Sequence, residues 1–351
     1  MKVSLKSLIA VTASVMTTGA FATSNLENPL YMPKGNEAYV KVGGAIMGKS
    51  VEGTQATRRK HRDGDVEFPV WRFTGDLGYG ITDRLDVHGR FGYTKDGEID
   101  RKGMHRGRIG LTFRALTEDY PVIWDLYADA YLSGVSPMKG TYTKNGFNFD
   151  NYSNGRWGAI FGTRFGKTWD KFTLAGHVEY LQTFGNHNNK IGIEQGIQPL
   201  MEKYGLLYTM GQFGFPAEIS VDLRSTHEWT AGFDMMYQIN QKWSLGGGFE
   251  FIEHYNNGVK SIHTEMGNVV FNLAPGVEVS TQDVIKGLLA ETNNMEDGWD
   301  EYVLKINAAY QMTDSLQVAG FFEYTFDDAQ PMSQNATDFK MELGARLNAR
   351  F

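Results

Sequence analysis

Apolar and polar residues alternate with a period of two along most of this chain. In its last thirteen residues, FKMELGARLNARF, every odd position from Phe339 to Phe351 is apolar. This period is typical of a β-strand with one apolar and one polar face, because successive side chains point to opposite sides. Twelve segments show it. They are residues 38–48, 70–81, 85–94, 105–115, 122–132, 156–166, 172–183, 226–239, 243–251, 301–312, 316–326 and 339–351.

The connections between these segments alternate between short and long. Five are short polar turns, and two of the others, residues 184–225 and 252–300, exceed 40 residues. Each segment is about as long as a tilted strand that crosses a bilayer. We therefore predict an all-β fold, a transmembrane antiparallel up-and-down β-barrel of twelve strands. Its short turns would lie at the periplasmic end and its long loops at the extracellular end.

The two longest loops leave an alternative strand count open. Strand-like pieces at residues 217–224, 269–273 and 277–279 could add one hairpin, which would make fourteen strands. The same loops carry helical spacing around residues 193–201 and 281–290. These stretches would form either a packed extracellular lobe or a constriction folded into the barrel mouth.

Large aromatic residues recur eight positions apart on the apolar face of the predicted strands. Eight residues span about 26 Å along a strand, or roughly 20 Å along the membrane normal once the strand is tilted. Aromatic belts at both membrane interfaces explain this spacing, whereas a soluble β-sandwich alternates without needing it. The pairs are Trp71 and Tyr79, Trp157 and Phe165, Phe172 and Tyr180, Trp229 and Tyr237, Trp243 and Phe251, and Tyr302 and Tyr310.

The N-terminus has the pattern of a secretory signal peptide. Lys2 and Lys6 precede an apolar stretch at residues 8–15, and the segment closes on Ala20, Phe21 and Ala22. We therefore divide the chain into a signal peptide (1–22), a short periplasmic N-terminal segment (23–37) and a single transmembrane barrel domain (38–351). No later window offers about 18 uninterrupted apolar residues, so we expect no transmembrane helix.

Composition agrees with a barrel. The 351 residues include 41 Gly and 13% aromatic residues but no Cys, so disulfides cannot stabilise this exported chain. The mean hydropathy of −0.37 is typical of strands that turn half of their residues toward a wet lumen. The net charge of −7 becomes −9 once Lys2 and Lys6 are removed, which argues against a nucleic-acid partner.

The terminal strand, the leader and the turn pattern together resemble the porin-like superfamily of Gram-negative outer-membrane β-barrels, from about Ala38 onward. The resemblance implies an outer-membrane location with lipid and lipopolysaccharide as partners. It also implies an insertion machinery that recognises a terminal aromatic, here Phe351. Twelve-stranded channels for acidic oligosaccharides or nucleosides are nearest in size, but no motif identifies one family. No family's site residues are therefore carried over, and the oligomeric state stays open.

The alternate residues that would point into the lumen form two groups along the strand order, a basic wall and an acidic wall. If the barrel closes, the walls face each other across the lumen and create a transverse field, as in general porins. Alternatively, the charges pair between neighbouring strands and fill the lumen, for example Arg90 with Asp76 or Asp86. The basic wall is Lys41, Arg72, Arg90, Arg106, Arg108, Arg114, Arg156, Arg164, Lys340 and Arg346, and the acidic wall is Glu179, Glu228, Asp234, Glu250 and Glu323.

Signatures of common enzymes are absent from the sequence: it has no G-x-S-x-G, no H-E-x-x-H and no phosphate loop. His88 and His177 point inward, and His254 lies near the extracellular rim close to Ser261, but nothing holds the latter two together. The acidic run at residues 296–301 lacks the ligand spacing of a calcium loop. We expect no catalytic residue, no cofactor and no metal.

The function that this pattern favours is passive diffusion of small polar or charged solutes through a porin-like channel. Two alternatives remain at this point. One is an outer-membrane enzyme of lipase or protease type with a rim active site, and the other is a structural or adhesive barrel with a filled lumen.

Overall fold

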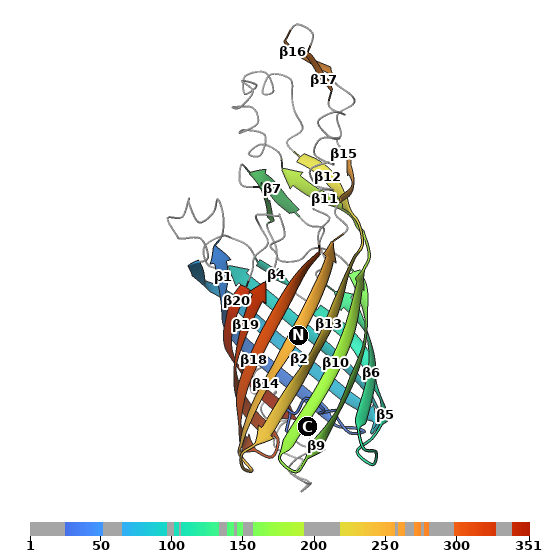
Figure 1. Cartoon of the computed structure of the whole chain (residues 1–351), viewed down its shortest axis with the longest axis vertical. Helices are drawn as coiled ribbons and strands as arrows, with labels where there is room; N and C mark the ends of the chain where they lie inside the picture. The colour runs from blue at the N-terminus through green and yellow to red at the C-terminus, as the bar shows by residue number, and fades with distance from the viewer. Residues whose placement is uncertain are drawn as a thin grey trace, which may run out of the picture.

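A computed structural model of the chain describes residues 25–51, 65–96, 102–104, 107–132, 139–143, 146–149, 157–192, 218–256, 259–263, 270–274, 277–280, 298–327 and 339–351. Twelve tilted antiparallel strands form a closed barrel (Figure 1). These are β1 (Ala38–Val51), β2 (Asp65–Thr82), β3 (Leu85–Asp96), β5 (Gly107–Leu116), β6 (Ile123–Leu132), β9 (Trp157–Trp169), β10 (Phe172–Thr183), β13 (Thr226–Gln238), β14 (Trp243–Asn256), β18 (Gly298–Thr313), β19 (Leu316–Asp327) and β20 (Phe339–Arg350).

Closure follows from the pairing of the first and last strands. β20 pairs with β19 and with β1, β1 pairs with β2, and β2 pairs with β3, so the sheet returns on itself. The chain end takes part in this closure, because Phe351 N donates to Ala38 O at 2.8 Å and Ala38 N donates to Phe351 O at 3.0 Å. Each of the twelve predicted segments becomes one barrel strand, which confirms the predicted fold.

The alternative of fourteen barrel strands is wrong. The strand-like loop pieces do form β12 (Glu218–Leu223), β16 (Val270–Ala274) and β17 (Val277–Ser280), but they pair in two separate small sheets beyond one rim (Figure 1). With six, five and four residues, they are shorter than the 9 to 11 residues that cross a bilayer. The extra strand in the barrel sheet is the three-residue β4 (Lys102–Met104), which pairs antiparallel with the end of β3.

The remaining loop strands are β7 (Lys139–Thr143), β8 (Gly146–Phe149), β11 (Asn186–Gly192) and β15 (Val259–His263), and they form one five-stranded sheet with β12. The stretches with helical spacing, at residues 193–201 and 281–290, lie outside the described residues. No helix in the described part of the chain is long and apolar enough to span a membrane.

The two faces of the barrel have opposite chemistry. On the outside, Phe73, Phe161 and Leu343 are exposed over more than half of their surfaces. On the inside, Asp125 and Asn348 are completely buried. The alternation therefore places apolar side chains outward and polar ones inward, which is the reverse of a soluble barrel with an apolar core.

Residues 25–37 lie inside the barrel at the end where the short turns lie, and we call them the N-terminal cap. Leu26 and Leu30 are only 2% and 4% exposed, and Leu30 packs against Ile123 of β6 and Ala175 of β10. The cap backbone also touches the wall, because a Cβ added at Gly80 would lie 2.0 Å from the carbonyl oxygen of Lys34. The cap therefore lies in this mouth of the barrel and packs against its wall.

Candidate functional site

The lumen is the candidate site, and Asn25 anchors the cap that forms its floor. The Asn25 amide donates to Gln238 Oε1 and to Ser244 Oγ, both at 3.0 Å, and its Oδ1 accepts from Gln317 Nε2 at 2.7 Å. These partners come from β13, β14 and β19. Because a buried amide without partners is costly, a side chain with three of them holds the cap in one position.

Glu27 makes a second anchor against β18, β20 and β1. Its Oε1 accepts from Asn348 Nδ2 at 2.7 Å, and its Oε2 accepts from Asn307 Nδ2 at 3.0 Å and pairs with Arg346. Burial opposes ionisation of this carboxyl, but the positive charges of Lys41 and Arg346 outweigh burial, so the pKa of Glu27 lies below its ordinary value. Glu27 is therefore a buried carboxylate with charged and neutral donors.

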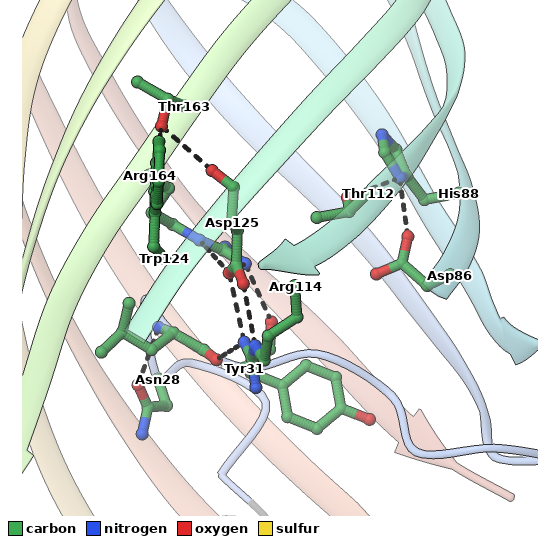
Figure 2. Close-up of polar contacts among 11 residues, drawn as sticks. Asn28, Tyr31, Asp86, His88, Thr112, Arg114, Trp124, Asp125, Thr163 and Arg164 are labelled. Carbon is green, nitrogen blue, oxygen red and sulfur yellow. Dashed lines mark hydrogen bonds and ion pairs between the residues drawn. The ribbon is translucent and has the colours of Figure 1, made fainter. Parts of the chain in front are cut away.

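Arg114 and Arg164 connect the other side of the cap to the wall (Figure 2). Both converge on the buried carboxylate of Asp125, Arg114 through Nε at 2.8 Å and Arg164 through Nη2 at 2.6 Å. Nη2 of Arg114 also donates to the Leu30 carbonyl at 2.8 Å, and Nη2 of Arg164 lies 3.5 Å from the Tyr31 carbonyl. Both arginines of this predicted basic wall are thus used to hold the cap.

Farther from the short turns, Arg108 reaches over two strands. Its Nη1 donates to Glu179 Oε2 at 3.0 Å, from β5 to β10, while β6 and β9 lie between them. The Tyr127 hydroxyl donates to the same oxygen at 3.1 Å, and Arg108 Nε lies 3.6 Å from Asp129. This pair joins a predicted basic-wall residue directly to a predicted acidic-wall residue.

Two further arginines pair on the basic side itself. Arg72 of β2 contacts Glu342 of β20 at 2.5 Å, across β1. Arg90 of β3 contacts Asp76 of β2 at 2.9 Å, and this contact uses Nε alone. The Arg90 side chain is inside the barrel yet 53% exposed, so it borders space that water can reach.

Most charges on the acidic side are also paired, whereas Glu323 faces another acid. Glu250 forms an ion pair with Lys305, and Asp234 lies 3.5 Å from Nδ1 of His177. Glu323 stands opposite Glu342 in the β19 and β20 register. Most described wall residues therefore have a partner of opposite charge, and the arrangement of two opposed walls stays a prediction.

Three predicted wall residues cannot be placed in this network. Arg106 and Arg156 lie outside the described residues. Lys340 belongs to β20 by its backbone, and its side chain lies outside the described part.

Three inward histidines share one arrangement, in which each ring lies between two carboxylates. In each case the two ring nitrogens face different carboxylates, so each ring links two acids of the wall. The contacts are His88 with Asp86 at 3.0 Å and Asp129 at 3.1 Å, His177 with Asp234 at 3.5 Å and Glu250 at 3.3 Å, and His254 with Glu228 at 2.9 Å and Glu301 at 3.4 Å.

The same geometry bears on the enzyme alternative. Thr112 Oγ1 lies 3.3 Å from His88 Nδ1, which has the order of a nucleophile and a base (Figure 2). A general base needs a free ring lone pair, whereas both nitrogens of His88 face carboxylates. The contacts of His88 therefore differ from those of a general base that faces one carboxylate and the nucleophile. Among the described residues, no cluster of three or more His, Asp or Glu side chains could hold a metal ion.

Inward aromatic rings lie flat against the wall. Each of three rings covers a glycine of the neighbouring strand, and an ideal Cβ at that glycine would come within 2.5 Å of the ring. Glycine at these positions therefore keeps the rings out of the centre of the lumen. The pairs are Tyr39 with Gly78, Tyr127 with Gly162, and Phe321 with Gly344.

The cap contacts were missed by sequence reasoning, which relied on alternation and so began at Ala38. A usable signal was present. Leu26, Leu30 and Met32 stand just before the first strand in a segment too short to form a core of its own, so they must bury against the barrel. Nothing in the sequence alone assigns Asn25 or Glu27 to partners more than 200 residues away.

No protein-family model matches the chain, and no curated protein matches it. Solved structures do. An outer-membrane channel from Pseudomonas putida F1 is 13% identical, with 93% of this chain and 100% of that chain covered and a TM-score of 0.50. The NanC porin is 9% identical, with 89% and 98% covered and a TM-score of 0.40.

A mutant of TodX, a monoaromatic hydrocarbon channel, is 10% identical, with 93% of this chain and 92% of that chain covered and a TM-score of 0.40. Such low identities establish the fold and leave the activity to the site itself. The chain has the fold of an outer-membrane β-barrel protein.

Proposed function

We propose that this protein is an outer-membrane channel for passive diffusion of small polar or charged solutes, with its periplasmic mouth narrowed by the N-terminal cap. The membrane lipid and lipopolysaccharide would surround the barrel, and the insertion machinery would recognise Phe351. In this proposal residues 1–22 are the cleaved leader, and the chain works without a catalytic residue or cofactor.

The observation that carries the proposal is the accessibility of charged side chains inside the barrel. Arg90 is 53% exposed and Asp234 is 33% exposed, although both point inward from strands on opposite sides of the sheet order. A lumen packed solid with side chains would bury both. Charged groups beside accessible space favour passage of polar solutes over apolar ones.

A filled structural barrel is the second candidate, and the cap favours it. Leu30, Ile123 and Ala175 form an apolar cluster in the short-turn mouth, and apolar contacts exclude water. Together with the paired charges above, this cluster supports a barrel that serves as a scaffold for its long loops. The two candidates differ in one measurable property, which is conductance.

The test is the single-channel conductance of the purified barrel in a planar bilayer, with and without residues 25–36. The channel proposal expects conductance above the bilayer background in the full chain, and a larger conductance after the deletion because the cap no longer narrows the mouth. Heat-modifiable migration on a gel controls for folding of both forms. If neither folded form conducts, the lumen is closed by its wall and the structural candidate replaces the channel.

A further inference from the structure

We infer that Arg90 and Tyr39 form a binding subsite in the lumen for the carboxylate of a small organic acid. This inference deepens the proposed function, and it rests on that function for the access of solute to the lumen. Arg90 combines three features: its side chain is the most exposed of the described lumen arginines that form ion pairs, it has unused donors, and it lies near a tyrosine hydroxyl.

Arg90 has donors to spare. A guanidinium carries five N–H donors, and the contact with Asp76 takes only Nε, at 2.9 Å. Among the described residues, neither Nη atom of Arg90 has a hydrogen-bond partner. Arg108 and Arg114 are more fully engaged, since Arg108 contacts two carboxylates and Arg114 contacts a carboxylate and a carbonyl. The two Nη atoms together present the fork that binds a planar carboxylate through two parallel hydrogen bonds.

Tyr39 supplies a second donor beside this fork. Its ring lies over Gly78, and an ideal Cβ at Gly78 would be 2.9 Å from the Tyr39 hydroxyl oxygen. Asp76, the partner of Arg90, is the next inward residue of β2 after Gly78, so the hydroxyl and the guanidinium occupy adjacent inward positions. Within the described part of the chain, the Tyr39 hydroxyl also has no hydrogen-bond partner.

Neighbouring charges select the class of ligand. Lys41 stands opposite Asp76 in the β1 and β2 register, so two bases, Lys41 and Arg90, flank one carboxylate. Lys41 also lies near the carboxylate of Glu27, so the positive charge open to a ligand is the free Nη side of Arg90, which a monoanion matches. A phosphate dianion would need a second free base, and Glu179 lies within electrostatic range of Arg90 to oppose it. The subsite therefore fits a carboxylate better than a phosphate.

The test compares D-glucuronate with D-glucose, which differ at one carbon by a carboxylate. Equilibrium binding to the refolded full chain should detect glucuronate and not glucose. Arg90→Gln should weaken glucuronate binding about tenfold or more, since a hydrogen bond to a charged group is lost. Arg90→Lys keeps the charge without the fork and should weaken binding less, and Tyr39→Phe should weaken it a few fold.

The matched control is Arg84→Gln, which removes an exposed arginine from the short turn of the same hairpin and should leave binding unchanged. Heat-modifiable migration checks that each variant folds, and Tyr39→Phe keeps the test available if Arg90→Gln does not fold. Equal binding of glucose and glucuronate, or unchanged binding in Arg90→Gln, would overturn the subsite, as would binding of inorganic phosphate in preference to glucuronate.

A separate measurement of solute flux distinguishes failure of the subsite from failure of the channel. Flux is measured as the swelling of lipid vesicles that carry the barrel. Binding of glucuronate without flux supports the subsite and contradicts the channel. Flux of glucose and glucuronate without any saturable binding supports the channel and contradicts the subsite.

Discussion

At the scale of single residues, the lumen of this barrel is organised by carboxylates that accept from several strands at once. Glu27 accepts from donors on β18 and β20, and Asp125 accepts from β5 and β9. Leaving such a group buried without its partners would cost more than any one of these bonds gains. The polar side chains of the lumen therefore determine where the cap lies.

The first prediction concerns Glu27 and pH. Its pKa is lowered in the folded state, so its contribution to stability is present above the ordinary carboxyl value of 4.5 and is lost as the pH falls through the lower folded pKa. Glu27→Gln should reduce the free energy of unfolding by about 1 to 3 kcal/mol at neutral pH. It should also remove part of the acid sensitivity, as measured by urea titration in lipid vesicles at several pH values.

Glu118→Gln is the matched control, because Glu118 is exposed in a short turn. It should change neither quantity. If Glu27→Gln and wild type lose stability with acid in the same way, the carboxylate does not anchor the cap as the geometry indicates.

The second prediction concerns Phe351. Its backbone already bonds to Ala38 in both directions, and a serine would keep these bonds. If the aromatic ring is an assembly signal, Phe351→Ser should lower the amount of folded, heat-modifiable protein in the outer membrane, whereas Phe351→Tyr should not. In vitro refolding of Phe351→Ser should stay near wild type, which separates assembly from stability. Equal amounts of wild type and Phe351→Ser in cells would contradict the signal.

At the scale of elements, strand prediction succeeded where one physical rule governs a whole segment. A strand between lipid and a wet lumen must alternate over its full length, so residues 339–351 and the other long segments could be assigned from sequence. The loop pieces misled because four to six alternating residues are common to any small sheet. The cap could not be predicted because its contacts depend on side chains that meet only after the barrel closes.

The third prediction concerns the two faces of one hairpin. Leu304 of β18 faces outward and is exposed. Leu304 pairs with Tyr324 of β19, and the next residue, Thr325, faces inward. Leu304→Arg should cost roughly 2 to 4 kcal/mol in the free energy of unfolding from vesicles. Thr325→Arg should cost much less, because water and the nearby carboxylate of Glu323 can solvate the charge. Equal costs for the two variants would mean that the assigned faces are wrong.

At the scale of the whole molecule, the lumen combines a short-turn mouth that the N-terminal cap occupies with paired charges around accessible space. Pairing lowers the net field, since Arg72, Arg90 and Arg108 each contact a carboxylate. The electric field that remains depends on the charge that is not cancelled within each ion pair. Ion selectivity therefore depends on the balance of positive and negative side chains around the whole lumen and not on one wall alone.

The last prediction tests this balance. Changing Arg72, Arg90 and Arg108 together to Gln leaves their partners Glu342, Asp76 and Glu179 uncompensated, so the lumen becomes more negative. We expect the reversal potential in a salt gradient to shift toward cation selectivity. The shift should be larger in dilute salt, because the Debye length is about 30 Å at 0.01 M and about 3 Å at 1 M.

A triple change of Arg84, Lys171 and Lys242 to Gln is the matched control. It removes the same charge from exposed turns at the short-turn end, outside the lumen, and should shift selectivity much less. Because breaking a buried ion pair can destabilise the fold, both triple variants must first migrate as folded, heat-modifiable barrels. If the two folded variants shift the reversal potential equally, the charge that ions sense lies at the mouth, and the lumen pairs do not set selectivity.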